Sequence, residues 1–231
     1  DSTALTVRVD GLRGGHSGVN IHEDRQKAIK LLTRALLQMR TGCLVRLESI
    51  NGGNKRNAIP RFAEATIVVA TDMVPVAQKM IQATEVRMQT MYANAEPNLT
   101  LTVEETQLPN TCYTVEQTGQ VLHLLHALPS GVLQMSPTVP ELVQTSNNLG
   151  TVVTTKSGIE IICMLRSNDD AELLVLTQAM ISHFGLVEDM VLPQAFFGTE
   201  AQTLTTDSLQ LEFSQVSPGW KVQPNNELVD L

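Results

Sequence analysis

The glycine-rich segment Gly14-Gly15-His16-Ser17-Gly18 contains the first residues whose types and spacing could support chemistry. Glycines permit tight or positive-φ backbone conformations, so such a loop can hold the His16 imidazole away from the body of the protein. A plain strand-to-helix turn with an exposed histidine is the commoner explanation for an isolated match of this kind. Ser17 is a poor nucleophile candidate, because a G-x-S-x-G elbow centred on it would need glycine at Val19. A phosphate loop is excluded, since no Gly-Lys-Ser/Thr follows.

Asn57 and Arg166 carry side chains suited to holding a ligand. Asn57 lies in the connection Asn51–Pro60 between two predicted strands, which is longer than a simple hairpin requires. Its amide offers both a donor and an acceptor. Arg166 ends a predicted strand, where a guanidinium could bind a carboxylate through two parallel hydrogen bonds. A salt bridge from Arg166 to Asp169 or Asp170 is an equally good explanation from spacing alone.

Two segments resemble parts of a binuclear zinc site but have simpler structural explanations. His22 and Asp24 lie where a helix is expected to begin, and Asp24 is a typical N-cap residue. Glu104 and Glu105 end a predicted strand, in which successive side chains point to opposite faces. We therefore predict no metal ligands within this chain.

Composition excludes several classes of protein. The 231 residues carry a net charge of −8 and only 3% aromatic residues, with no basic stripe, so nucleic-acid binding is disfavoured. No apolar run approaches the ~20 residues of a membrane span. Three widely spaced cysteines argue against a disulfide framework and fit a reducing compartment. The start at Asp1, without Met and directly before a strand-like run, indicates a piece of a longer protein.

The elements that must position these residues follow from hydrophobic periodicity. In the first half it predicts, in order, a strand at Leu5–Val9, a helix from Asp24 to about Arg40, strands at Cys43–Ile50 and Glu64–Ala70, a helix at about Val76–Ala95 and a strand at Leu99–Glu104. This order is the split βαβ pattern of ferredoxin-like domains.

The second half repeats the pattern more loosely. It predicts a helix at Val115–Leu128, strands at Leu142–Thr154 and Ile159–Arg166, a helix at Ala171–Phe184, and strand-like stretches near Asp189–Ala195 and Leu209–Phe213. We expect an α+β fold in which two ferredoxin-like units share a continuous antiparallel sheet with helices on one face. Residues 1–110 would form the first unit, residues 111–216 the second, and residues 217–231 a return segment toward a further domain.

In this order along the chain, the motifs resemble the lid, or dimerisation, domain of the aminoacylhistidine dipeptidases (Xaa-His dipeptidase, peptidase D). These enzymes belong to the metallopeptidase clan of carnosinase and the succinyl-diaminopimelate desuccinylases. The matching segments are Gly11–Gly18, Ile21–His22 with Ala28–Leu32, Asn51–Gly53 with Arg56–Arg61, Glu160–Ser167 and Pro218–Trp220.

The resemblance implies a parent metallo-dipeptidase whose catalytic half, flanking the lid on both sides in sequence, binds two zinc ions. It implies that His16 stabilises the tetrahedral oxyanion, often in the partner subunit, that Asn57 hydrogen-bonds the dipeptide and that Arg166 binds its C-terminal carboxylate. It further implies a cytoplasmic homodimer acting on Xaa-His-type dipeptides, in which this chain alone is inactive.

Two other functions remain open from the sequence. A freestanding ferredoxin-like module for ligand binding or dimerisation explains the order of strands and helices but gives no reason for the two loops. An independent hydrolase using Ser17 or Cys112 lacks a base placed nearby by any recognisable motif.

Overall fold

The computed structural model describes residues 1–185, 202–205 and 209–213 of the chain. Its first strand follows the apolar alternation of the sequence closely. In β1 (Ser2–Asp10) the side chains of Leu5, Val7 and Val9 are buried, whereas Arg8 between them is exposed. Alternate side chains of a strand point to opposite faces, so one face of this strand lies on the core.

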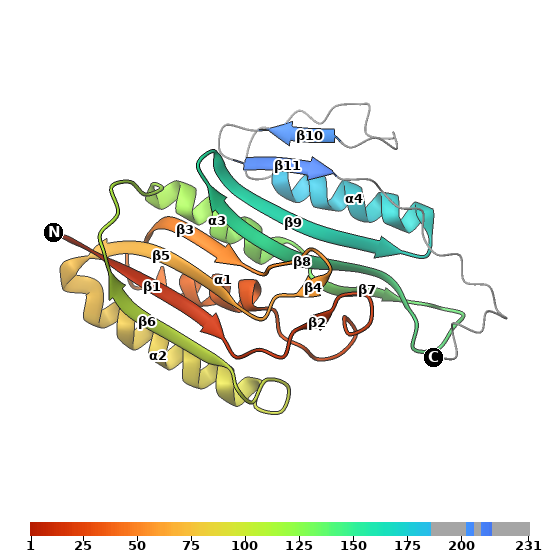
Figure 1. The fold of residues 1–231 in the computed structure, drawn as a ribbon, viewed down its shortest axis with the longest axis horizontal. Helices are drawn as coiled ribbons and strands as arrows, with labels where there is room; N and C mark the ends of the chain where they lie inside the picture. The colour runs from red at the N-terminus through yellow and green to blue at the C-terminus, as the bar shows by residue number, and fades with distance from the viewer. Residues whose placement is uncertain (186–201, 206–208, 214–231) are drawn as a thin grey trace.

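The first half of the chain forms a four-stranded antiparallel arrangement with two long helices (Figure 1). The order β3-β5-β1-β6 places β1 between β5 and β6, which is the predicted split βαβ pattern. After β1 its elements are β2 (Gly15–His16), α1 (Ala28–Met39), β3 (Arg46–Gly52), β4 (Ala58–Ile59), β5 (Ala63–Ala70), the short 3-10 helix η1 (Thr71–Met73), α2 (Val74–Met91) and β6 (Thr100–Thr106).

The second half extends the same sheet. Its elements are α3 (Val115–Ala127), β7 (Gly131–Met135), β8 (Val143–Thr155), β9 (Gly158–Ser167), α4 (Asp170–Gly185), β10 (Gln202–Thr205) and β11 (Leu209–Phe213). Strand β8 pairs with β3 of the first half through Asn51↔Val153 and Gly52↔Val152, so the sheet is continuous. Strand β11 lies beside β9 and runs parallel to it, so this half departs from the split pattern of the first.

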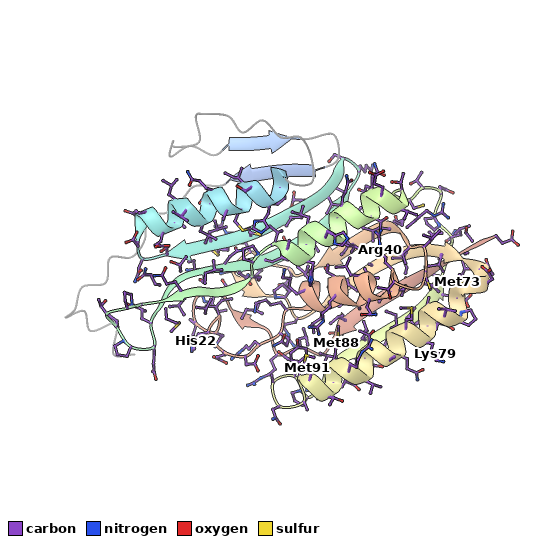
Figure 2. The ribbon with its side chains drawn as sticks, turned by 180° about the vertical axis from the view of Figure 1, so that it is seen from behind. His22, Arg40, Met73, Lys79, Met88 and Met91 are labelled. Carbon is purple, nitrogen blue, oxygen red and sulfur yellow. The ribbon has the colours of Figure 1, made fainter. Side chains whose placement is uncertain are left out.

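The helices lie on one face of the sheet. Figure 2, which shows the molecule from behind the view of Figure 1, has helices α1, α2, α3 and α4 in front of the strands. Helix α1 is the most deeply buried, because its apolar residues face the sheet on one side and helices α2 and α3 on the others. Its fully or nearly fully buried apolar side chains are Ala28, Ile29, Leu31, Leu32, Ala35, Leu36 and Met39.

The predicted α+β class, with one large antiparallel sheet and helices on one face, is therefore confirmed. The division at residue 110 stays a prediction. The predicted strand near Asp189–Ala195 and the return segment 217–231 lie outside the described residues. In the part of the chain that the structure describes, no helix has the length and apolarity that crossing a membrane requires.

The predicted start of the first helix is wrong. Helix α1 begins at Ala28, with Lys27 rather than Asp24 at the N-cap position. The N–H of Ala28 donates to the carbonyl of Pro60, a residue of the connection before β5, at 3.0 Å. A tertiary contact thus replaces the side-chain cap expected from the local sequence.

Candidate substrate-binding site

The two loops singled out in the sequence pair with each other. Strand β2 of the glycine-rich segment lies antiparallel to β4, with His16 opposite Ala58. The backbone N–H of Ser17 also donates to the carbonyl of Asn57 at 2.9 Å. The two segments are about forty residues apart in the sequence. They therefore come together only in the fold, at the end of the sheet (Figure 1).

Arg166 reaches the same surface from β9. A Cβ atom added at Gly18 would lie 3.1 Å from Cε1 of His16 and 3.4 Å from Cζ of Arg166, so the imidazole and the guanidinium both lie against this glycine. The predicted residues His16, Asn57 and Arg166 are thus brought together from three separate parts of the chain.

The salt bridge from Arg166 to Asp169, one alternative considered from the sequence, is not among the ion pairs of the described residues. The carboxylate of Asp169 accepts the backbone N–H groups of Ala171 and Glu172 at 2.9 and 3.0 Å, at the start of α4. The Nη2 atom of Arg166 donates to Sδ of Met164 at 3.5 Å, and its Nε atom is buried without a hydrogen-bond partner in the described part of the chain.

The orientation of the His16 imidazole follows from its own loop. The Nδ1 atom accepts the backbone N–H of Gly18 at 3.1 Å. A neutral imidazole that accepts at Nδ1 carries its proton on Nε2. The exposed side chain therefore presents an N–H donor to its surroundings, which is the form that can stabilise developing negative charge on an oxygen.

A polar network behind His16 fixes its backbone. The Oδ1 atom of Asn20 accepts the N–H of His16 at 3.0 Å, and the N–H of Asn20 donates to the carbonyl of His16 at 2.8 Å. Glu23 accepts from Nδ2 of Asn20 and from Arg25, which also donates to the carbonyl of Gly14. The hydrogen bonds from Asn20 and Arg25 lower the pKa of the Glu23 carboxyl below its usual value of 4.5.

Asn148 is a supporting residue that the sequence analysis missed. Its side chain is 1% exposed, and Nδ2 donates to the carbonyls of Arg56 and Ala58 at 2.9 and 2.8 Å. These two carbonyls flank Asn57, so Asn148 holds the Asn57 loop against β8. The signal in the sequence was the Asn147-Asn148 pair inside a predicted strand, where such residues are disfavoured.

Glycines allow the Asn57 loop to approach β8 closely. The register of β8 shifts between Leu149 and Thr151, which marks an irregularity at Gly150. A Cβ at Gly150 would lie 2.7 Å from the carbonyl oxygen of Arg56. Gly53 has φ of 68°, and a Cβ there would lie 1.9 Å from the carbonyl oxygen of Gly150. No other residue type fits either position without movement of the backbone.

Ser17 does not have the geometry of a nucleophile. Its side chain is 1% exposed, and Oγ has no hydrogen-bond partner among the described residues. A nucleophilic serine needs a base within hydrogen-bond reach and access to substrate.

The residues set aside as metal ligands remain apart. His22 and Asp24 lie on the surface of the loop, while Glu104 and Glu105 are exposed near the end of β6, at positions opposite Thr6 and Leu5 of β1. Within residues 1–185 and the two short described strands, no group of three or more His, Cys, Asp or Glu residues could hold a metal ion.

Comparison with known proteins identifies the domain. Residues 7–96 match the family model of the peptidase dimerisation domain. This segment starts within β1 and ends after α2, and it includes β2 to β5 with α1 and α2, together with His16 and Asn57. The chain therefore carries the dimerisation domain of the M20 peptidases, as the order of its motifs predicted.

Two of the similar proteins are named as dipeptidases. The chain is 37% identical over 167 residues to the cytosol non-specific dipeptidase of Escherichia coli strain K12, a match that covers 72% of this chain and 34% of that protein. It also matches the crystal structure of the aminoacylhistidine dipeptidase of Vibrio alginolyticus with a TM-score of 0.78 and 27% identity, over 80% of this chain and 38% of that one. The chain thus spans about a third of the length of these relatives.

Proposed function

We propose that this chain is the substrate-covering lid and dimerisation domain of a cytoplasmic two-zinc dipeptidase that hydrolyses Xaa-His-type dipeptides. The domain type and the similarity to dipeptidases support the general assignment. The zinc ions belong, in this proposal, to a catalytic part outside this chain, where they would activate water. The chain's own contributions are contacts to the substrate and the surface through which two copies associate.

The single observation that carries the proposal is the convergence of His16, Asn57 and Arg166 on one surface. The Nε2–H donor of His16 suits the oxyanion of a tetrahedral intermediate. Arg166 suits the carboxylate at the C-terminus of a dipeptide, and the Asn57 amide suits its peptide group. Together they would hold the substrate against the catalytic part of the enzyme, a positioning effect.

The test is the substitution His16→Ala in the full-length enzyme. Removing a donor to the oxyanion should lower kcat about 100- to 1,000-fold, because the contact strengthens only in the transition state. The change in KM should be small. Steady-state kinetics with a dipeptide substrate measures both constants.

His22→Ala is the matched control, because His22 is an exposed histidine of the same loop, labelled in Figure 2, with no hydrogen bond to the site. It should leave kcat within a factor of about two, as expected for a surface substitution. Equal losses in the two variants would contradict the proposed role of His16. Sedimentation of the full-length enzyme tests the homodimer, and metal analysis tests the two zinc ions.

A further inference from the structure

Glu96 is a buried charge that the proposed function does not use. It lies in the connection between α2 and β6 and is 1% exposed. Its backbone is held in a turn, since its N–H donates to the carbonyl of Tyr92 at 2.7 Å and its carbonyl accepts the N–H of Leu99 at 3.1 Å. A buried carboxylate is costly unless its oxygens are hydrogen-bonded, so its partners indicate why it is there.

Both partners of the carboxylate belong to the segment that carries His16, residues 11–27, called here the His16 loop. The Oε2 atom accepts the backbone N–H of Arg13 at 2.7 Å, and Oε1 accepts that of Gln26 at 2.8 Å. One of these residues precedes His16 and the other lies at the far end of the loop. A single side chain therefore ties both ends of the loop to the α2–β6 connection.

The contact requires a carboxylate of this length. A glutamine has one acceptor oxygen, so its amide N–H groups would face one of the two backbone donors. The negative charge of Glu96 also acts on Lys27. Burial lowers the pKa of Lys27, and the charges of Asp24 and Glu96 oppose that lowering. Gly11, with φ of 78°, adds a close approach, because a Cβ there would lie 1.9 Å from the carbonyl oxygen of Asn98.

We propose that Glu96 is a positioning residue that sets the place of His16 by fixing both ends of the His16 loop. The polar network of Asn20, Glu23 and Arg25 shapes the inside of the loop, whereas Glu96 determines where the loop as a whole lies on the sheet. The catalytic consequence rests on the proposed function of His16, but the effect on the loop does not.

The first experiment measures amide hydrogen exchange in this chain with Glu96→Gln. Amides of Ser17 and Asn20, which are hydrogen-bonded within the site, should exchange about tenfold faster, because the loss of a charge-assisted hydrogen bond is of that size. Amides of α1 and β5 should keep their wild-type rates. Glu96→Asp, which keeps the charge but is too short to reach both donors, should give a smaller increase and covers the case in which Glu96→Gln fails to fold.

The matched control is Glu85→Gln. The carboxylate of Glu85 also accepts a backbone N–H, that of Leu101 in β6 at 3.0 Å, without touching the His16 loop. It should leave the exchange of Ser17 and Asn20 unchanged. Wild-type exchange of the loop in both Glu96 variants, or equal acceleration in Glu85→Gln, would overturn the inference.

The second experiment is a double-mutant cycle in the full-length enzyme. Glu96→Gln should lower kcat about tenfold in the wild-type background and have no further effect in His16→Ala, because it acts through His16. Equal losses in both backgrounds would overturn the positioning role. If the loop exchanges faster in Glu96→Gln but neither Glu96→Gln nor His16→Ala changes kcat, the proposed function fails while the effect of Glu96 on the loop stands.

Discussion

At the scale of the residue, Arg166 is the proposed contact for the C-terminal carboxylate of the substrate. Its guanidinium lies against Gly18, with one hydrogen bond to sulfur and an Nε atom that has no partner in the described part of the chain. Sulfur is a weak acceptor, so it contributes little compared with a carboxylate. In the proposed function the guanidinium binds an anionic group through two parallel hydrogen bonds, which lysine cannot reproduce.

We therefore expect Arg166→Lys in the full-length enzyme to lower kcat/KM for a dipeptide about 10- to 100-fold, the size of a lost charged hydrogen bond. The loss should lie mainly in KM. A dipeptide amide lacks the terminal carboxylate, so the same substitution should change its kcat/KM little. The control is Arg8→Lys, because Arg8 is an exposed residue of β1 that pairs with Glu64 at 2.8 Å, away from the site. Equal losses for the acid and the amide would argue against a carboxylate contact.

At the scale of elements, the sequence predicts what local periodicity determines and misses what distant contacts determine. The long strands and the four helices follow from apolar spacing, and their predicted and observed boundaries differ by a few residues. Strand β7 was missed because its apolar residues Leu133 and Met135 are exposed while Gln134 between them is partly buried, the reverse of the usual alternation. The start of α1 was misplaced because its cap is the carbonyl of Pro60, far away in the sequence.

In the candidate site, too, the local features are visible in the sequence and the distant contacts are not. The side-chain types of His16, Asn57 and Arg166 and their loop or strand-end positions are visible in the sequence. Their supports are not, because Glu96 and Asn148 reach the two loops from other elements after folding. A single sequence contains no signal for pairs formed at such separations, since only the fold brings them together.

The internal network of the His16 loop should depend on pH through Glu23. Its folded-state pKa lies below 4.5, so its charged form stabilises the loop fully above the unfolded pKa, and this contribution is lost as pH falls through the folded pKa. The backbone amide resonances of His16 and Asn20, followed by NMR from pH 6 to about pH 3, should shift together with the Glu23 carboxyl titration. Glu23→Gln should abolish this shift. If the amide resonances of His16 and Asn20 still shift in that variant with the wild-type midpoint, the role of Glu23 is contradicted.

At the scale of the whole molecule, the two halves are joined by more than the sheet. Besides the β3–β8 pairing, the N–H of Leu47 donates to Oγ1 of Thr118 at 2.8 Å, and the N–H of Tyr113 donates to the carbonyl of Leu47 at 2.7 Å. Lys30 of α1 donates to the carbonyls of Leu125, His126 and Leu128 at the end of α3. A cation at a helix C-terminus satisfies carbonyls that have no partner inside the helix.

Because of these contacts, we expect the chain to unfold in one cooperative transition rather than as two units. Two thiols report on the two halves separately. Cys43 lies buried in the first half. Cys163 lies in the second half, where burial raises the pKa of its thiol to about 12, so neither thiol reacts readily in the folded state. Their labelling during urea unfolding, measured by mass spectrometry, should show the same midpoint. Two separate midpoints would mean that residues 1–110 fold independently.

Lys30→Met tests the joint between the halves directly. It should lower the free energy of unfolding by about 2 kcal/mol, because the carbonyls at the end of α3 lose a charged donor in a partly buried place. Both thiols should still become reactive at one, lower midpoint, since the sheet remains continuous. Lys79→Met, at an exposed position of α2 labelled in Figure 2, is the control and should change stability by less than about 0.5 kcal/mol. If Lys30→Met splits the transition, this one side chain rather than the shared sheet couples the two halves.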